Sequence, residues 1–264
     1  MIPVDVRFTP DMFLDYRLAR HGLTREDLGV APTVVVSWFP DLVDHLAGEA
    51  GATVCEHWLY RHRNFDLYRA VIDGIPVGFA SLPVGAPGTV AYLEELMAVG
   101  ARRLVGLGLA GSLQERAPVG SFLLPGSCIR EEGTSPHYLP LDVEVRPDAA
   151  LMAAIEAAAA RAGLETHSGR HWTTDAPYRE FVWKIEKYRA EAVLGVDMET
   201  SAMYALGQFH GVPVANLLVV SDELWREWNP AFGTAGLREA MRRAAAAILA
   251  GLPALAGAGG DGQG

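Results

Sequence analysis

Two pairs of carboxylates occur in this sequence, each directly after an apolar run. One pair, Asp197 and Glu199, follows a run that ends at Val196, and the other, Asp222 and Glu223, follows a second run. Carboxylates accept hydrogen bonds from sugar hydroxyls and can donate or accept protons. Taken singly, each acid can equally cap a helix. Two acid pairs after two successive apolar runs favour a binding or catalytic site.

The elements around these acids are expected to be a strand, a helix and a second strand. Residues 201–209 have apolar side chains at helical spacing, and Gly211 with Pro213 ends that helix. The flanking apolar runs, 192–196 and 214–220, are typical of buried strands. This pattern predicts a βαβ unit of a parallel sheet, in which ligands bind at the carboxyl ends of the strands.

The rest of the chain shows the same alternation, which predicts one α/β domain over residues 1–250. Residues 1–31 are expected to form an N-terminal arm, and residues 251–264 a disordered Gly/Ala-rich tail. Further strands are expected at 33–37, 67–72, 76–79, 103–107, 120–124 and 164–168, with a hairpin turn at Asp73-Gly74, and helices at 12–20, after Pro40, and at 85–100, 149–162 and 233–250. The polar stretch 170–179 is expected to be a loop.

Composition excludes several classes of function. A net charge of −10 argues against a basic nucleic-acid-binding face. Cys55 and Cys128 are far apart and outside any CxxC pattern, and no apolar run reaches the length of a membrane span. The N-terminus lacks the apolar core of a signal peptide. A cytoplasmic protein that binds neither membrane nor nucleic acid is therefore expected. The eight histidines show no metal-binding spacing, so no metal is expected.

A glycine-rich stretch from Gly106 to Gly111 fits the GxGxxG pattern and follows a predicted strand. A dinucleotide site would require a helix to start within the motif. Pro118 and Gly120 break any such helix before it completes two turns. No dinucleotide or other cofactor is therefore predicted.

Several blocks of the chain resemble the nucleoside phosphorylase family, its uridine phosphorylase branch in particular. The blocks occur in family order between about His21 and Leu249, and they are HGLTREDL, RNFDLYRAVIDGIPV, GAPGTVAYLEEL, GLAGSLQ, REEGTSPHYLP, WTTDAPYRE, VDMETSAMYA and VVSDEL. The resemblance implies a three-layer α/β/α domain around a mixed, partly barrel-like sheet. It also implies cleavage of the N-glycosidic bond of a nucleoside by a homo-oligomer of dimers, possibly a hexamer built as a trimer of dimers.

The resemblance also implies roles for individual residues. Met198 and Glu199 match the ribose-binding pair, and Asp222 matches the general acid of purine-cleaving members, which favours a purine or purine-like base. Asp222 is expected to be protonated when substrate binds, with Ser221 orienting it. Other residues implied to contact substrate are Asp197, Tyr178, Arg179, Ala110 and Gly111. A neighbouring subunit is expected to supply Arg63, Arg20 and His21. Arg226 or Arg238 is expected to assist the acid, and Trp225 or Trp228 to cover the base.

The chain departs from the family where phosphate should bind. Residues that the family uses as phosphate anchors are replaced here by Trp38, Leu42, Gly106 and Leu109. A buried dianion without such partners is costly. The sequence therefore favours hydrolysis, with Asp41 or Asp44 as a conceivable base for water. Phosphorolysis with a rebuilt phosphate site and nucleoside binding without catalysis are the alternatives.

Overall fold

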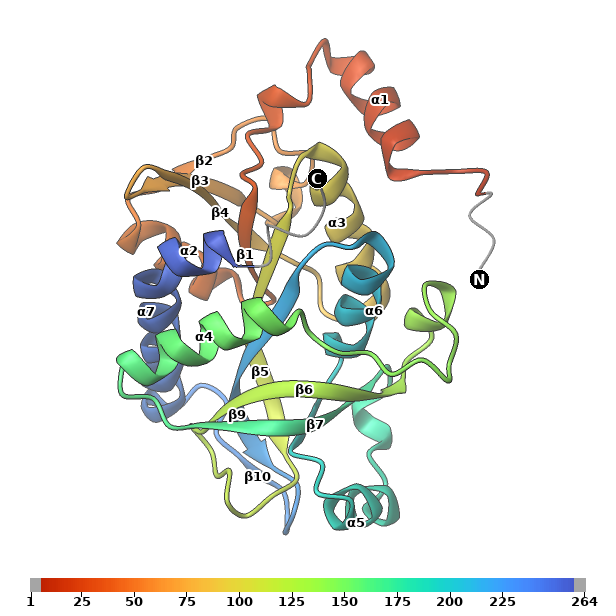
Figure 1. Ribbon diagram of the computed structural model, residues 1–264, viewed down its shortest axis with the longest axis vertical. Coiled ribbons are helices and arrows are strands. Elements are labelled where there is room, and N and C mark those ends of the chain that lie inside the picture. Colours follow the sequence, from red (N-terminus) through yellow and green to blue (C-terminus); the bar gives the residue numbers. More distant parts are fainter. Residues whose placement is uncertain (1–5, 259–264) are drawn as a thin grey trace.

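A mixed sheet runs through the molecule in the computed structural model, which describes residues 6–258 (Figure 1). Over those residues its strands are β1 (Thr33–Ser37), β2 (Thr53–Val54), β3 (Leu67–Ile72), β4 (Ile75–Ser81), β5 (Arg103–Ser112), β6 (Phe122–Glu131), β7 (Thr166–Thr174), β8 (Gly195–Asp197), β9 (Val214–Glu223) and β10 (Asn229–Pro230). They follow the order β10-β9-β6-β7-β8-β5-β1-β4-β3-β2. Because β9 also pairs with β5, the strands β5, β9, β6, β7 and β8 close into a barrel-like ring.

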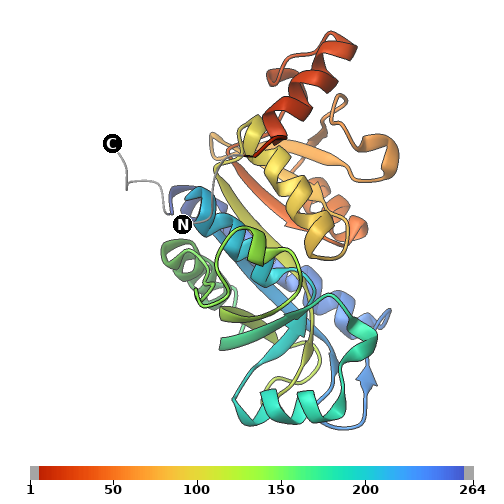
Figure 2. The same cartoon turned by 90° about the vertical axis from the view of Figure 1, so that its right-hand side faces the viewer.

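Helices cover both faces of the sheet (Figures 1 and 2). They are α1 (Pro10–His21), α2 (Pro40–Glu49), α3 (Ala86–Val99), α4 (Ala149–Arg161), α5 (Val182–Ala190), α6 (Thr200–His210) and α7 (Ala235–Gly257). A large apolar core lies between the sheet and α1, α3 and α6, and another lies between the sheet and α2, α4 and α7. Smaller apolar clusters form around Leu218 and around Trp172. The predicted three-layer α/β class with a partly barrel-like sheet is confirmed.

The hairpin between β3 and β4 is confirmed at the predicted turn. Ile72 pairs with Ile75, and the two residues between them, Asp73 and Gly74, have φ angles of 51° and 81°. A two-residue turn with positive φ at both positions matches the right-handed twist of paired strands, and Asp-Gly adopts it readily.

The parallel βαβ unit predicted around α6 is wrong in its pairing. The strand β5 lies between β8 and β9, and it runs antiparallel to β8 but parallel to β9. The acids nevertheless meet, because Val196 of β8 and Asp222 of β9 both pair with Gly111 of β5, from its two sides. Apolar periodicity shows that a segment is a strand, but closure of the ring decides which neighbour it pairs with.

Two boundary predictions also change. The expected loop 170–179 begins within β7, and its residues 171–174 are buried. The expected disordered tail is helical as far as Gly257, since α7 continues through Pro253 and buries Leu252 and Leu255. Residues 1–5 of the predicted arm and 259–264 of the predicted tail lie outside the described residues. The GxGxxG stretch lies wholly inside β5, so the prediction that no helix starts there is confirmed.

Candidate active site

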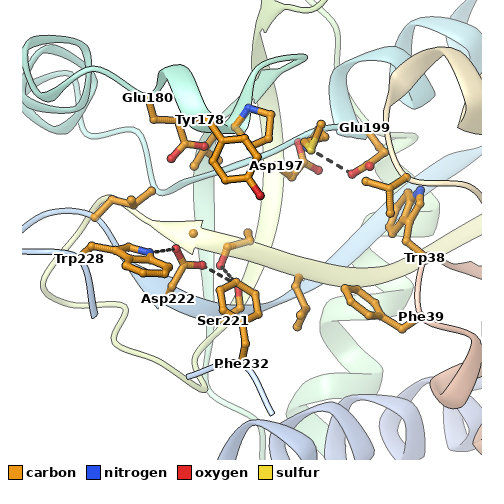
Figure 3. A pocket seen from close by; sticks show the side chains of 18 residues that line it. Trp38, Phe39, Tyr178, Glu180, Asp197, Glu199, Ser221, Asp222, Trp228 and Phe232 are labelled. Carbon is orange, nitrogen blue, oxygen red and sulfur yellow. Dashed lines mark hydrogen bonds between the residues drawn. The ribbon is translucent and has the colours of Figure 1, made fainter. Parts of the chain in front are cut away.

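A cavity of about 740 Å³ opens beside the ends of β5, β8 and β9, where the two acid pairs are placed (Figure 3). Many of the residues that the sequence analysis singled out line it. These are Trp38, Leu109, Ala110, Gly111, Tyr178, Asp197, Met198, Glu199 and Asp222. Ser221 and Trp228, which the sequence analysis also named, line it as well. The other lining residues are Phe39, Val84, Pro177, Glu180, Val196, Leu224 and Phe232.

Glu199 lies at the start of α6 and is held by backbone N–H groups. Its Oε1 accepts a hydrogen bond from the N–H of Gly85 at 2.6 Å, and its Oε2 accepts one from the N–H of Met198 at 3.2 Å. Burial of the side chain, followed by the nearby charge of Asp197, raises the pKa of Glu199. The hydrogen bond to Gly85 therefore holds Glu199, at the start of α6, against the start of α3.

Asp197 has a structural role, because both of its carboxylate oxygens accept hydrogen bonds from other residues of the chain. Thr173 Oγ1 donates to Asp197 Oδ1 at 2.8 Å, and the N–H of Thr200 donates to Oδ2 at 3.1 Å, as does the Thr200 hydroxyl. Hydrogen bonding to the first backbone N–H groups of a helix is the normal role of a capping aspartate. The side chain therefore fixes the start of α6 and with it the position of Glu199.

Asp222, at the end of β9, accepts one hydrogen bond on each oxygen. Ser221 Oγ donates to Oδ1 at 2.7 Å, and Trp228 Nε1 donates to Oδ2 at 2.9 Å (Figure 3). Donors aimed at both oxygens favour the ionised carboxylate. The expectation that Asp222 carries a proton when substrate binds stays a prediction.

Glu180 is an ionisable residue of the cavity lining that was not predicted from the sequence. It follows the short helix Pro177–Arg179, is half-buried, and faces the cavity on the same side as Asp222 (Figure 3). Burial and then the charge of Asp222 raise the pKa of Glu180 to about 7. Arg179, which was predicted with Tyr178 to contact substrate, is exposed, and its guanidinium donates to the carbonyl of Tyr178.

Several predicted residues do not reach the cavity within this chain. Arg20, His21 and Arg63 are exposed on other segments, and none of them lines the cavity. Arg226 forms an ion pair with Glu223 and stacks over Trp225, with its guanidinium carbon 4.8 Å from the ring centroid. It therefore pairs with the neighbour of Asp222 rather than with Asp222 itself.

The replaced phosphate anchors have different surroundings. Trp38 Nε1 donates to Thr89 Oγ1 at 2.7 Å, and its ring covers Gly108, where an added Cβ would lie 2.6 Å from the indole. Leu109 lines the cavity, whereas Leu42 of α2 packs in the core and Gly106 faces the buried side chain of Asn216. Trp38 therefore occupies space next to the cavity that smaller side chains would leave open.

The electrostatic character of the cavity is acidic. Its ionisable lining side chains are Tyr178 and four carboxyl groups, those of Glu180, Asp197, Glu199 and Asp222, and no arginine, lysine or histidine of residues 6–258 lines it. Among those same residues, no three or more histidine, cysteine or acidic side chains form a group that could hold a metal ion. Nor does any helix there have both the length and the apolar content needed to cross a membrane.

Gly106 provides a test of how tightly β5 is packed beneath the cavity. A Cβ there would lie 2.2 Å from Asn216 Oδ1, and the Asn216 side chain is held by a hydrogen bond to Thr200. Gly106→Ala is therefore expected to lower the free energy of unfolding by about 1–3 kcal/mol, as overpacking does. Denaturant titration measures this. Gly48→Ala is the matched control, because nothing lies within 4 Å of that position. Equal stability of the two variants would contradict the packing described.

The sequence of this chain is similar to those of known proteins over most of its length. Residues 32–252 match the model of the phosphorylase superfamily. The chain is 30% identical over 205 residues to the uridine phosphorylase of Escherichia coli (strain K12), covering 72% of this chain and 80% of that protein. It is 26% identical to the uridine phosphorylase of Thermococcus kodakarensis, covering 71% of each chain. It is 25% identical to the guanosine phosphorylase of Halorubrum lacusprofundi, covering 75% of this chain and 81% of the relative.

Proposed function

Because this chain belongs to the phosphorylase superfamily, we propose that it is an enzyme that cleaves the N-glycosidic bond of a nucleoside. The observation that carries the proposal is the pair of carboxylates, Glu199 and Asp222, on two sides of one cavity (Figure 3). They come from two different strand ends, and each is oriented by its own hydrogen bonds. Uridine and guanosine phosphorylases among the relatives support a nucleoside as the substrate.

In this proposal the sugar lies against Glu199 and the base lies towards Asp222. Hydrogen bonds from the 2′- and 3′-hydroxyls stabilise the ionised form of Glu199 against the burial that raises its pKa, while Met198 packs beside the ribose. Breaking the glycosidic bond develops positive charge on the sugar and negative charge on the base. A carboxylate on the sugar diol compensates the first charge, and an acid at the base end neutralises the second. Such an acid favours a purine or purine-like base, which offers a basic ring nitrogen.

The comparisons favour phosphate as the nucleophile, rather than the water that the sequence analysis preferred. The relatives described above are phosphorylases, so phosphorolysis is the first candidate reaction. Hydrolysis is the second, and one observation favours it: the lining of the described cavity is acidic, with Trp38 and Leu109 where an anion site was expected. A dianion bound there needs cationic partners. In the phosphorolytic reaction we propose that a second copy of the chain supplies them, with the exposed Arg63 as the candidate, within a dimer-based homo-oligomer.

Phosphate dependence tests the proposal directly. The purified protein is incubated with purine and pyrimidine nucleosides, with and without inorganic phosphate, and free base and sugar 1-phosphate are quantified. Base release that requires phosphate and yields sugar 1-phosphate in equal amount is the expected result. Release at the same rate without phosphate, with free ribose as the product, would establish hydrolysis instead. Release of no base from any nucleoside would overturn the proposed function.

A further inference from the structure

Two carboxyl groups, rather than one, face the base end of the cavity. Asp222 comes from the end of β9, and Glu180 comes from the segment between β7 and α5 (Figure 3). In general, two neighbouring carboxyl groups in a partly buried site do not both remain ionised at neutral pH, because their like charges repel. The environment of each group therefore decides which one carries the proton.

The hydrogen bonds distinguish the two groups. Both oxygens of Asp222 accept hydrogen bonds, from Ser221 and from Trp228. In the described part of the chain, the Glu180 carboxyl has no hydrogen-bond donor and no cationic partner within ion-pair distance. Since donors stabilise the charged form and Glu180 lacks them, the proton is favoured on Glu180.

We propose that Glu180 is the acid that protonates the departing base, and that Asp222, held by Ser221 and Trp228, lies beside it at the same end of the cavity. This inference rests on the proposed cleavage of a nucleoside. It reassigns the role of general acid, which the family resemblance implied for Asp222, to a residue that the same comparison did not single out.

The proposed step balances as follows. The bond between C1′ of the sugar and the base nitrogen breaks, and its electron pair passes to the base. The carboxyl proton of Glu180 moves to a ring nitrogen of the base, which leaves as a neutral molecule, and Glu180 becomes a carboxylate. Phosphate or water supplies the oxygen that bonds to C1′. Glu180 regains a proton from solvent after the base has left, or from the attacking water in the hydrolytic case.

The surroundings of Glu180 determine the direction of the pH dependence. Burial raises the pKa of Glu180, and so does the charge of Asp222, to a value of about 7. The other ionisable groups near it are Tyr178 and Arg179 on its own segment, the latter turned to solvent, with Asp197 and Glu199 across the cavity. An acid with this pKa holds its proton below about pH 7, so kcat/KM is expected to fall as pH rises through that value.

The first test is the pH profile of Glu180→Gln. Glutamine keeps the shape of the side chain but has no acidic proton, so kcat/KM near neutral pH is expected to fall about 10²–10⁴-fold, with loss of the alkaline limb. Glu186→Gln, on the exposed face of α5, is the matched control and should keep the wild-type profile. A Glu180→Gln variant that retains an alkaline limb near pH 7 at wild-type rates would overturn the assignment.

The second test uses a substrate that needs no acid. An N7-methylated purine nucleoside already carries a positive charge on its base, which therefore leaves as a neutral molecule without protonation. Glu180→Gln is expected to cleave it within about 10-fold of the wild-type rate, while its activity on the unmethylated nucleoside is lost. Equal losses on both substrates would show that Glu180 shapes the pocket rather than delivers a proton. If the wild-type protein released no base from either nucleoside, the proposed function itself would fail.

Discussion

Glu199→Gln is expected to lower kcat/KM for a ribonucleoside about 10³-fold, because the substituted amide cannot accept two hydroxyl hydrogen bonds with full negative charge. Each hydrogen bond to a charged group contributes about 1.5–3 kcal/mol, so two of them correspond to this loss. The fold should survive, since the amide oxygen of glutamine can still accept the N–H of Gly85, now bound at 2.6 Å. Steady-state kinetics and thermal unfolding measure the two quantities separately.

Two controls accompany the Glu199 variant: one is a second protein variant, and the other is a substrate that lacks the 2′-hydroxyl. Glu156→Gln changes an exposed glutamate of α4 and should leave kcat/KM unchanged. A 2′-deoxynucleoside lacks one of the two hydroxyl partners, so the loss caused by Glu199→Gln should be smaller with it, by about 10-fold or more. If the variant lost the same factor with both nucleosides, the carboxylate would not be the group that binds the diol.

Asp222→Asn is expected to reduce kcat/KM about 10²-fold near pH 7, and part of this loss should be regained on acidification. The amide removes the charge that helps raise the pKa of Glu180, so Glu180 loses its proton at lower pH than in the wild-type protein. Burial, the larger cause of the shift, remains, so the alkaline limb should move to lower pH without disappearing. The rest of the loss reflects the missing negative charge beside the protonated base.

The measurement is a pH profile of kcat/KM for Asp222→Asn and the wild-type protein under the same conditions. A displaced limb supports the division of roles between Asp222 and Glu180. An alkaline limb that vanishes in Asp222→Asn but persists in Glu180→Gln would identify Asp222 as the proton donor. Trp228→Phe removes one donor to Asp222 and should cause a smaller loss than Asp222→Asn.

Much of the fold follows from local pattern. The strand 33–37, the Asp73-Gly74 hairpin and the helix after Pro40 occur where their residue types predict them, because turn geometry and apolar spacing act over a few neighbouring residues. The same local reasoning predicted that no helix starts in the glycine-rich stretch, and a strand runs through it. The two acid pairs were likewise visible from spacing, whereas Met198 and Tyr178, which line the same cavity, were implied by the family resemblance.

Strand partners and side-chain neighbours depend on tertiary structure. No local pattern shows that β5 separates β8 from β9, since that order results from closing the ring. Nor does spacing reveal that Asp197 accepts the N–H of Thr200 at the start of α6 while Glu199 is held by the N–H of Gly85, although the two acids are almost adjacent. The groups that a carboxylate contacts determine its role, and the tertiary structure determines which groups those are.

The base end of the cavity shows the same limit most clearly. Residue types identify Asp222 as an acid at a strand end, and family resemblance suggests a role for it. Only the folded chain brings Trp228 to one of its oxygens and Glu180 to the same cavity, from a segment about 40 residues earlier in the chain. Residue types therefore state which groups can carry a proton, whereas burial, hydrogen bonds and neighbouring charge decide which of them does.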